Sequence, residues 1–395
     1  MEVRARAPGK IILSGEHAVV HGSAAVAASI DLYTEVSLKI STDSEGSDGL
    51  LKLHLKDLGL QFSWPTEKIK EALPGPCIPL PPPTCSLESM KSLASLVEDQ
   101  NIPEANFGLA TGVSTFLWLY TSVHGFKPAT AVVTSSLPLG AGLGSSAAFC
   151  VAVSASLLAL SDLVNLDQNK KGWQSFQENE LELVNKWAFE GEKMIHGKPS
   201  GIDNTVSTFG NMIMFKSGQL TLIKPSMPLK MLITNTKVGR NTKALVASVS
   251  ERTMRHPEAM ASVFTAVDSI SKELSTIVQS PAPDDLTVTE NEDKLQELME
   301  MNQGLLQSMG VSHTTIETVL RTTLKYKLAS KLTVYFSRAL ESTRLKSTID
   351  SLTNGSVLAG TIVDKVIAEL ESCGFQCLIA EIGGKGVEVS FSSSS

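Results

Sequence analysis

The sequence predicts a fold that mixes β-strands and α-helices and that is divided into two or three domains. Short stretches with strand character are interspersed with longer stretches whose apolar residues have helical spacing. A chain of 395 residues is long enough for more than one domain and for a sizeable core. The most informative stretch is a glycine-rich loop, residues 137–148, which lies between a predicted strand and a predicted helix.

The composition narrows the class of protein. The formal net charge of −7 argues against nucleic acid as a partner and against binding to an anionic membrane. The longest apolar run, residues 147–160, is interrupted by serines and is shorter than the ~18 residues that a membrane span needs. The first residues lack the apolar core of a signal peptide, so we expect a cytoplasmic protein. The five cysteines are scattered, which favours free thiols over a disulfide framework or a zinc site.

The loop between a predicted strand, residues 129–137, and an apolar helix, residues 147–160, predicts a phosphate-binding site. Glycines at every second position let the backbone turn tightly and let its N–H groups approach an anion. These glycines are Gly140, Gly142 and Gly144. The N-terminus of the helix would then face the anion.

Two hydroxyl groups begin this helix. Ser145 and Ser146 could cap exposed N–H groups or bind the Mg²⁺ that accompanies a nucleotide. The stretch is not a Walker A motif, because no Gly-Lys pair follows, and its glycine spacing differs from that of a dinucleotide-binding motif. The alternative interpretation is a tight turn that merely joins a strand to a buried helix.

Near the N-terminus, a single lysine precedes an apolar run. Lys10 follows a predicted turn at Pro8 and Gly9 and lies at the mouth of a strand, where an unpaired ammonium group would be costly to bury. We therefore expect a negatively charged partner, with a surface lysine as the alternative. Glu16 and His17 follow in a polar turn, where they could hydrogen-bond a hydroxylated substrate or satisfy backbone groups.

Two acidic residues, Glu192 and Asp203, lie on either side of the end of a predicted helix, residues 180–196. Glu192 borders the apolar face of this helix, where a carboxylate needs a cation, although a solvent-reaching or salt-bridged glutamate is the alternative. His196 is at the C-terminal end of this helix, where we expect it to interact with the helix dipole and not to act as a ligand. The helix ends at Gly197, and Asp203 follows in a loop where it could be only an N-cap.

The second half of the chain continues the mixture of strands and helices. A strand is predicted over residues 229–236, and mostly amphipathic helix over residues 259–306 with a charged break at 281–293. A helix, residues 363–370, and a strand, residues 375–382, then lead to a glycine-rich hairpin turn and a last strand.

Four of these stretches together resemble the small-molecule kinases of the galactokinase, homoserine kinase, mevalonate kinase and phosphomevalonate kinase group. The resemblance runs from Arg6 to Thr333 and resumes at Thr361. Within the group, the last two of the four stretches are most similar to the mevalonate kinases, those of plants in particular. The four stretches are residues 7–10 with 15–22, the glycine-rich loop through Ser146, residues 185–192 and residues 195–204.

The resemblance implies an α+β fold of two domains. The first, residues 1–225, would have a ribosomal-protein-S5-like fold, and the second, residues 226–395, a ferredoxin-like fold. It implies ATP-dependent phosphorylation of mevalonate to 5-phosphomevalonate, with Mg²⁺, in the synthesis of isoprenoid and sterol precursors. ATP and mevalonate would be the partners, without nucleic acid or membrane, and a homodimer is compatible with the resemblance.

The resemblance also assigns roles to individual residues. By position, Asp203 corresponds to the catalytic aspartate and Lys10 to the lysine beside it. Ser146 and Glu192 would hold Mg²⁺. The candidates for the mevalonate side are Glu16, His17 and Thr242. The candidates for ATP are Ser135, Gly140, Ala141, Gly142, Leu143, Gly144, Ser145 and Ser146.

One segment departs from the group, residues 334–360. The resemblance calls for a second glycine-rich loop and a sheet strand after Thr333, but no glycine occurs between Gly310 and Gly355. Bulky residues cannot adopt positive φ cheaply, so the loop's backbone path would be lost. We therefore expect an incomplete C-terminal sheet with unpaired neighbouring edges.

Two further functions stay open. One, because the second glycine-rich loop is missing, is an inactive or weakened protein of the same fold that binds a ligand without transfer. The other is a kinase for a different small alcohol.

Overall fold

The computed structural model describes residues 2–41, 48–73, 82–100, 102, 107–227, 229–239, 242–333, 336–341 and 360–392. Its strands are β1 (Glu2–Ser14), β2 (Ala25–Ile40), β3 (Leu50–Leu55), β4 (Leu60–Pro65), β5 (Ala129–Ser135), β6 (Gln174–Ser175), β7 (Met212–Lys216), β8 (Gln219–Ile223), β9 (Leu229–Asn235), β10 (Ser330–Thr333), β11 (Phe336–Glu341), β12 (Gln376–Ile382) and β13 (Glu388–Ser392).

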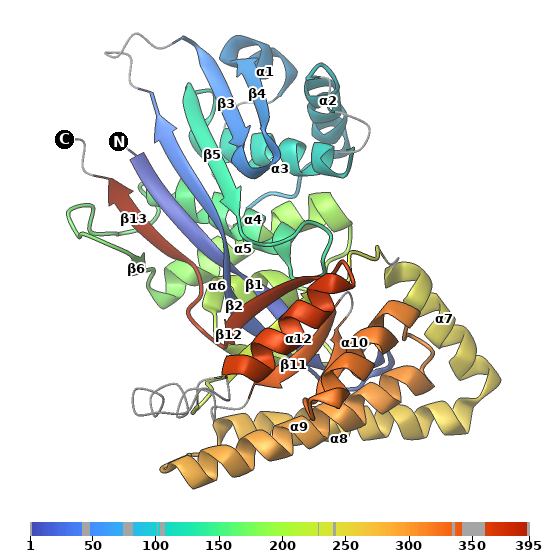
Figure 1. Ribbon diagram of the computed structural model, residues 1–395. Coiled ribbons are helices and arrows are strands. Elements are labelled where there is room, and N and C mark those ends of the chain that lie inside the picture. Colours follow the sequence, from blue (N-terminus) through green and yellow to red (C-terminus); the bar gives the residue numbers. More distant parts are fainter. Residues whose placement is uncertain are drawn as a thin grey trace.

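Helices accompany these strands along the whole chain (Figure 1). The short 3₁₀ helices used below are η1 (Ala18–His21) and η3 (Lys56–Leu58). The α-helices are α1 (Thr66–Ala72), α2 (Leu87–Glu98), α3 (Phe107–His124), α4 (Ser145–Ala159), α5 (Glu178–His196), α6 (Ile202–Phe209), α7 (Thr242–Arg255), α8 (Pro257–Gln279), α9 (Asp285–Ser308), α10 (Thr314–Lys325) and α12 (Gly360–Ser372).

The long strands β1 and β2 form the spine of the sheet. In the described residues, 13 strands belong to one sheet whose main path is β10-β11-β9-β12-β2-β1-β13-β6. One end of β2 pairs with β7 over residues 25–28, and the other end pairs with β5 over residues 34–40. Figure 1 shows α1, α2 and α3 beside β3–β5, and α7–α10 at the opposite end of the molecule. The structure therefore confirms the α+β class, and the division at residue 225 stays a prediction.

Helix α4 is the buried centre of the N-terminal half. Twelve of its 15 residues are buried, and it is apolar on every side because it packs between β1 and β2 on one face and α3, α5 and α6 on the other. The sequence predicted this helix and the strand β5 before it to within two residues at each end.

The chain continues through Pro8 and Gly9 without the predicted turn. Both residues lie inside β1, where the pairing with β2 changes register between them. The turn prediction was wrong because Pro8 and Gly9 both stay paired, opposite Tyr33 and Ile30, and the two extra residues at this irregularity, 31 and 32, belong to β2. Lys10 therefore extends from the middle of a strand.

Strand β11 corrects the expectation of an incomplete C-terminal sheet. It lies between β10 and β9 and pairs antiparallel with both, from Thr333 opposite Phe336 to Lys230 opposite Glu341. Strand pairing needs only backbone N–H and C=O groups, and the stretch 336–341 contains neither proline nor glycine. The rest of the atypical segment, residues 334, 335 and 342–359, lies outside the described residues.

The predicted glycine-rich hairpin near the C-terminus was also wrong. Strand β12 pairs with β9 and reaches β2, whereas β13 pairs with β1 and β6, so β12 and β13 are not neighbours. The backbone between them bonds to other segments: the N–H of Gly383 donates to the Ser29 carbonyl at 2.8 Å, and that of Asn211 donates to the Gly384 carbonyl at 2.7 Å. These contacts carry the chain across the sheet.

Two further expectations can be compared with the described part of the chain. Cys85, Cys150, Cys373 and Cys377 are free thiols, and Cys77 lies outside the described residues. None of the described helices has both the length and the hydropathy that crossing a membrane requires.

The crossing between β12 and β13 gives the first prediction. A Cβ atom on Gly386 would lie 2.1 Å from the Thr208 carbonyl oxygen, so Gly386→Ala should lower the free energy of unfolding by about 2 kcal/mol or more. Urea unfolding measures the change. The matched control is Gly384→Ala, where no atom lies within 4 Å of the new Cβ and the change should stay within about 0.5 kcal/mol. Equal effects of the two substitutions would contradict the prediction.

Candidate active site

A cavity of about 1040 Å³ lies where β1, the glycine-rich loop and five α-helices meet. Its wall combines two sets of residues from different elements. The polar set comes from β1 and from the ends of α4, α5, α6 and α7, and consists of Lys10, Ser145, Ser146, His196, Asp203 and Thr242. The apolar set comes from β3, η3, α3 and β5, and includes Leu53, Leu55, Leu58, Leu109, Val113 and Val133. The cavity can therefore hold a molecule with one charged and one apolar part.

The glycine-rich loop has the backbone conformation that its spacing predicts. Gly140, Gly142 and Gly144 have φ angles of 68°, 71° and 72°, in the left-handed region that favours glycine. All three line the cavity, whereas Ala141 and Leu143 between them are buried, at 5% and 1% exposed. The loop thus turns its glycines towards the cavity and its apolar side chains towards the core.

The loop also lies directly against β1. The N–H of Lys10 donates to the Leu143 carbonyl at 2.8 Å, and a Cβ on Gly144 would lie 2.7 Å from Lys10 Cγ. Gly144 is the N-cap of α4, and no side chain caps this helix end. The capping role considered for Ser145 and Ser146 is therefore not what the structure has. The open helix N-terminus beside the cavity can bind an anion.

Lys10 and Asp203 form an ion pair in the cavity wall. Lys10 Nζ lies 3.2 Å from Asp203 Oδ2, and Lys10 is only 6% exposed, so it is not a surface lysine. Asp203 lies in the first turn of α6, whose N-cap is Gly201, so the N-cap interpretation of Asp203 was wrong. Helix α6 is fixed to β1 because Ser207 Oγ donates to the Pro8 carbonyl at 2.6 Å.

Glu192 is buried beside this pair. It is 2% exposed, and burial and then the negative charge of Asp203 raise the pKa of its carboxyl from 4.5 to about 7. A hydrogen bond with Ser146 and the positive charge of Lys10 oppose this rise. On its buried side, the thiol of Cys150 donates to Glu192 Oε1 at 3.9 Å. The solvent-reaching alternative for Glu192 is thus excluded.

His196 connects two of the candidate residues. Its Nε2 lies 3.0 Å from Ser146 Oγ and 4.0 Å from Glu192 Oε2, and the ring lines the cavity. Sequence reasoning assigned His196 only to the helix end. The spacing of four residues from Glu192 was the missed signal, because such residues share one helix face.

The far part of the cavity contains Ser135, the remaining candidate for ATP. Its hydroxyl lies 2.8 Å from Thr34 Oγ1, and its N–H donates to Asp57 Oδ2 at 2.5 Å. Asp57 and Leu58 of η3 also line the cavity, and sequence reasoning missed both. Local sequence carries no sign of them, because β3 and β5 come together only in the folded sheet.

Of the three candidates for the mevalonate side, the structure brings only Thr242 to the cavity wall. Glu16 is 1% exposed, and its carboxylate forms an ion pair with Lys331 and accepts a hydrogen bond from Asn302 Nδ2 at 3.3 Å. His17 is 6% exposed and is also absent from the cavity wall.

The residues around Glu192 fit a magnesium ion by their chemistry. Magnesium prefers oxygen ligands, and the cluster offers the Ser146 hydroxyl and the Glu192 carboxylate. Burial first, and the negative charge of Asp203 second, raise the pKa of Glu192, and the positive charge of Lys10 only partly opposes this rise. Within the described part of the chain, no three His, Cys, Asp or Glu side chains are grouped to hold a metal. A divalent cation here would therefore need further ligands from a bound molecule.

The buried carboxyl of Glu192 gives a prediction on pH. Since its pKa is raised from 4.5 to about 7, the folded state binds the proton more tightly than the unfolded state, and stability falls as pH rises through this range. Glu192→Gln should remove up to about 3 kcal/mol of this loss. Urea unfolding between pH 4.5 and 8, without nucleotide, measures it. Glu182→Gln, an exposed carboxylate on the same helix, should follow the wild type; parallel curves for Glu192→Gln and wild type would contradict the prediction.

Comparison with known proteins identifies relatives of the chain in sequence and in fold. Residues 113–211 match the family model described as the GHMP kinases N terminal domain. The fold is similar to that of the Methanococcus jannaschii mevalonate kinase, with a TM-score of 0.67 and 18% identity over 96% of this chain and 98% of that one. It is also similar to L. major mevalonate kinase in complex with R-mevalonate, with a TM-score of 0.61 and 22% identity over 96% of both chains.

Closer similarity is found in sequence. The mevalonate kinase of Arabidopsis thaliana is 58% identical over 394 residues, which cover 99% of this chain and 100% of that one. The mevalonate kinase of Homo sapiens is 36% identical over 396 residues, which cover 97% of this chain and 93% of that one. Both matched regions span nearly the whole chain, and so both halves of the molecule. The chain belongs to the mevalonate kinase family, within the wider group of GHMP kinases.

Proposed function

We propose that this protein transfers the γ-phosphoryl group of ATP to the primary hydroxyl of mevalonate, giving 5-phosphomevalonate. The observation that carries the proposal is the ion pair between the buried Lys10 and the partly exposed Asp203, 3.2 Å apart, next to the uncapped N-terminus of α4 in one cavity. The relatives named mevalonate kinase and the solved complex of one of them with R-mevalonate support the choice of acceptor.

We assign the nucleotide to the apolar part of the cavity and to the glycine-rich loop. A planar base would bury apolar surface between β3, η3 and α3, with Ser135 and Asp57 at its polar edge. The triphosphate would lie along Gly140, Gly142 and Gly144, where backbone N–H groups and the helix dipole favour negative charge. Placing the charge at backbone groups explains how a chain of net charge −7 would bind a polyanion.

We assign Mg²⁺ to Ser146 and Glu192, with phosphate oxygens completing its ligands. The bound ion would neutralise charge on the phosphates during transfer. His196 would hold the Ser146 hydroxyl in place from 3.0 Å. The bound cation would supply the positive charge that the buried Glu192 carboxylate needs.

Asp203 and Lys10 would act on the acceptor. The Asp203 carboxylate would accept the proton of the attacking hydroxyl, and Lys10, at 3.2 Å, would fix its orientation. Lys10 would also attract the oxygens of the phosphoryl group during transfer. Phosphoryl transfer depends mainly on positioning and charge neutralisation, and this set of residues provides both. Thr242 in the cavity wall would contact the mevalonate.

The finer assignments are proposals of the same kind. We place the reaction in the cytoplasm and in the supply of isoprenoid and sterol precursors. The alternative of a binding protein without activity was motivated by the missing second glycine-rich loop. Strand β11 supplies the sheet strand that was expected to be lost with that loop, and residues 334, 335 and 342–359 lie outside the described residues. No observation favours the alternative over the kinase.

Asp203→Asn tests the proposed function. Removing the proton acceptor while keeping the shape of the side chain should lower kcat for mevalonate by roughly 10²- to 10⁴-fold. The assay is ADP release with ATP, Mg²⁺ and mevalonate, with galactose and homoserine as comparison acceptors. Asp99→Asn, an exposed carboxylate paired with Lys68, is the matched control and should leave kcat unchanged. ADP release from the wild type with galactose or homoserine but not mevalonate would refute the proposed acceptor.

A further inference from the structure

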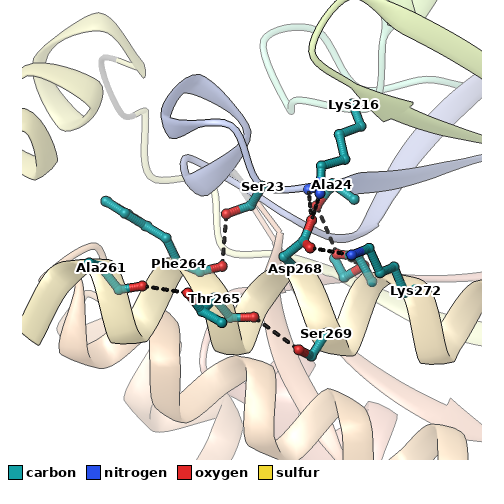
Figure 2. Close-up of polar contacts among 11 residues, drawn as sticks. Ser23, Ala24, Lys216, Ala261, Phe264, Thr265, Asp268, Ser269 and Lys272 are labelled. Atoms are coloured by element: carbon teal, nitrogen blue, oxygen red, sulfur yellow. Dashed lines mark hydrogen bonds and ion pairs between the residues drawn. The ribbon is translucent and has the colours of Figure 1, made fainter.

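The segment that joins β1 to β2, residues 15–24, is held by elements from the second half of the chain. It includes η1, and its end is bound to α8 (Figure 2). Ser23 Oγ donates to the Phe264 carbonyl at 2.9 Å, and the N–H of Ala24 donates to Asp268 Oδ1 at 2.8 Å. Lys216 and Lys272 each place an ammonium group 2.7 Å from the same Asp268 carboxylate. This end of the segment therefore has a fixed position on α8.

A buried ion pair holds the beginning of the 15–24 segment. The side chains of Glu16 and Lys331 are both 0% exposed and paired, and Lys331 comes from β10. The Lys331 ammonium group also lies 3.4 Å from the Ile12 carbonyl of β1. Asn302 of α9 donates to the second Glu16 oxygen at 3.3 Å. One lysine thus fixes both the last residues of β1 and the segment that follows.

A buried ion pair of this kind contributes little net stability to the folded protein. Burying two charges removes their hydration, and apolar residues of similar size at the same place often give a protein that is no less stable. A buried pair is best attested where it fixes one arrangement against others. Its location here indicates what is fixed, because Lys10 and Ile12, just before it on β1, both line the cavity.

The residue after Glu16 shows the same constraint. His17 has a φ of 61°, which is costly for a residue with a side chain, and it precedes η1. Such a conformation persists only where the surroundings determine it. Glu16 is fixed by its ion pair on one side, and on the other side Ala18 is 0% exposed in an apolar cluster with Phe264 and Val267 of α8.

We propose that Glu16 and Lys331 are positioning residues for the acceptor alcohol. They hold the end of β1 and the turn at His17 in one arrangement, and so fix the side of the cavity where Lys10 meets Asp203. This inference rests on the proposed function. It assigns Glu16 a role through its neighbours and not through contact with mevalonate. Lys331, which sequence reasoning did not single out, receives a role for the first time.

The test separates position from stability. In Glu16→Met/Lys331→Met, apolar side chains replace both charges, so the full-length protein should unfold in urea at the wild-type concentration or above. The KM for mevalonate should rise about 10- to 100-fold, because a shift near 1 Å at the reacting groups has effects of that size. The KM for ATP should stay within about twofold, because the nucleotide side is built by other elements. Hydrogen exchange should quicken at residues 16–22 and remain unchanged in α4.

Three further variants keep the test decisive. Lys331→Arg retains the positive charge, so its KM for mevalonate should stay close to that of the wild type, in contrast to the double variant. Asn302→Leu removes only the 3.3 Å contact to Glu16, and it should raise the KM for mevalonate by a smaller factor than the double variant. This variant takes the place of the double variant if that one fails to fold. The matched control is Lys325→Met/Glu369→Met, which removes an exposed Glu–Lys pair between α10 and α12 and should change neither KM.

The outcomes distinguish this inference from the proposed function. A wild type that releases no ADP with mevalonate would refute the proposed function itself. An active wild type with an equally active, folded double variant would overturn the positioning role. Equal rises in the KM for mevalonate and for ATP would also overturn it, because they would indicate a general structural effect.

Discussion

The close contact between β1 and the glycine-rich loop determines the geometry of the whole site. The Lys10 N–H bonds to the Leu143 carbonyl, and both Gly9 and Gly144 lie where a Cβ atom would overlap the opposite segment. This contact places the open end of α4 beside the Lys10 side chain. The elements that contribute the other functional groups, α5 and α6, pack on α4 in turn. A change of a few tenths of an ångström in this contact would therefore move the N-terminus of α4 relative to the Lys10–Asp203 ion pair.

The arrangement of charges in the cavity lowers the stability of the protein when no ligand is bound. Lys10, Glu192 and Asp203 are brought together with one positive and two negative charges, and burial together with the charge of Asp203 raises the pKa of Glu192. On the proposed function, a cation that arrives with the substrate would stabilise these carboxylates. The site is thus better suited to the loaded state than to the empty one, which is a reason to expect metal and nucleotide to bind together. The buried Glu16–Lys331 pair differs, because its two charges balance within the protein.

Sequence reasoning succeeded where the signal was local. The strand, loop and helix around Gly144 follow from a run of apolar residues and alternating glycines, and Glu192 follows from its position on one helix face. It failed where two distant segments meet. Nothing near Glu16 indicates Lys331, which is 315 residues away, and nothing near Ser135 indicates Asp57. The bulge opposite Gly9, the strand at residues 336–341 and the crossing at Gly383 likewise depend on partners that local patterns do not reveal.

The pairing of β1 with β13 has a consequence for biosynthesis. Arg6 and Glu388, which bond across these strands, are 382 residues apart, so the ribosome needs roughly 20 to 80 s to add the second after the first. During that time one edge of β1 in the nascent chain has no β13 to pair with. The outward arginines on this strand, Arg4 and Arg6, would hinder its association with other unfinished chains, since charged side chains discourage intermolecular strand pairing. Translation of the C-terminal region thus completes a sheet whose first strand was made at the outset.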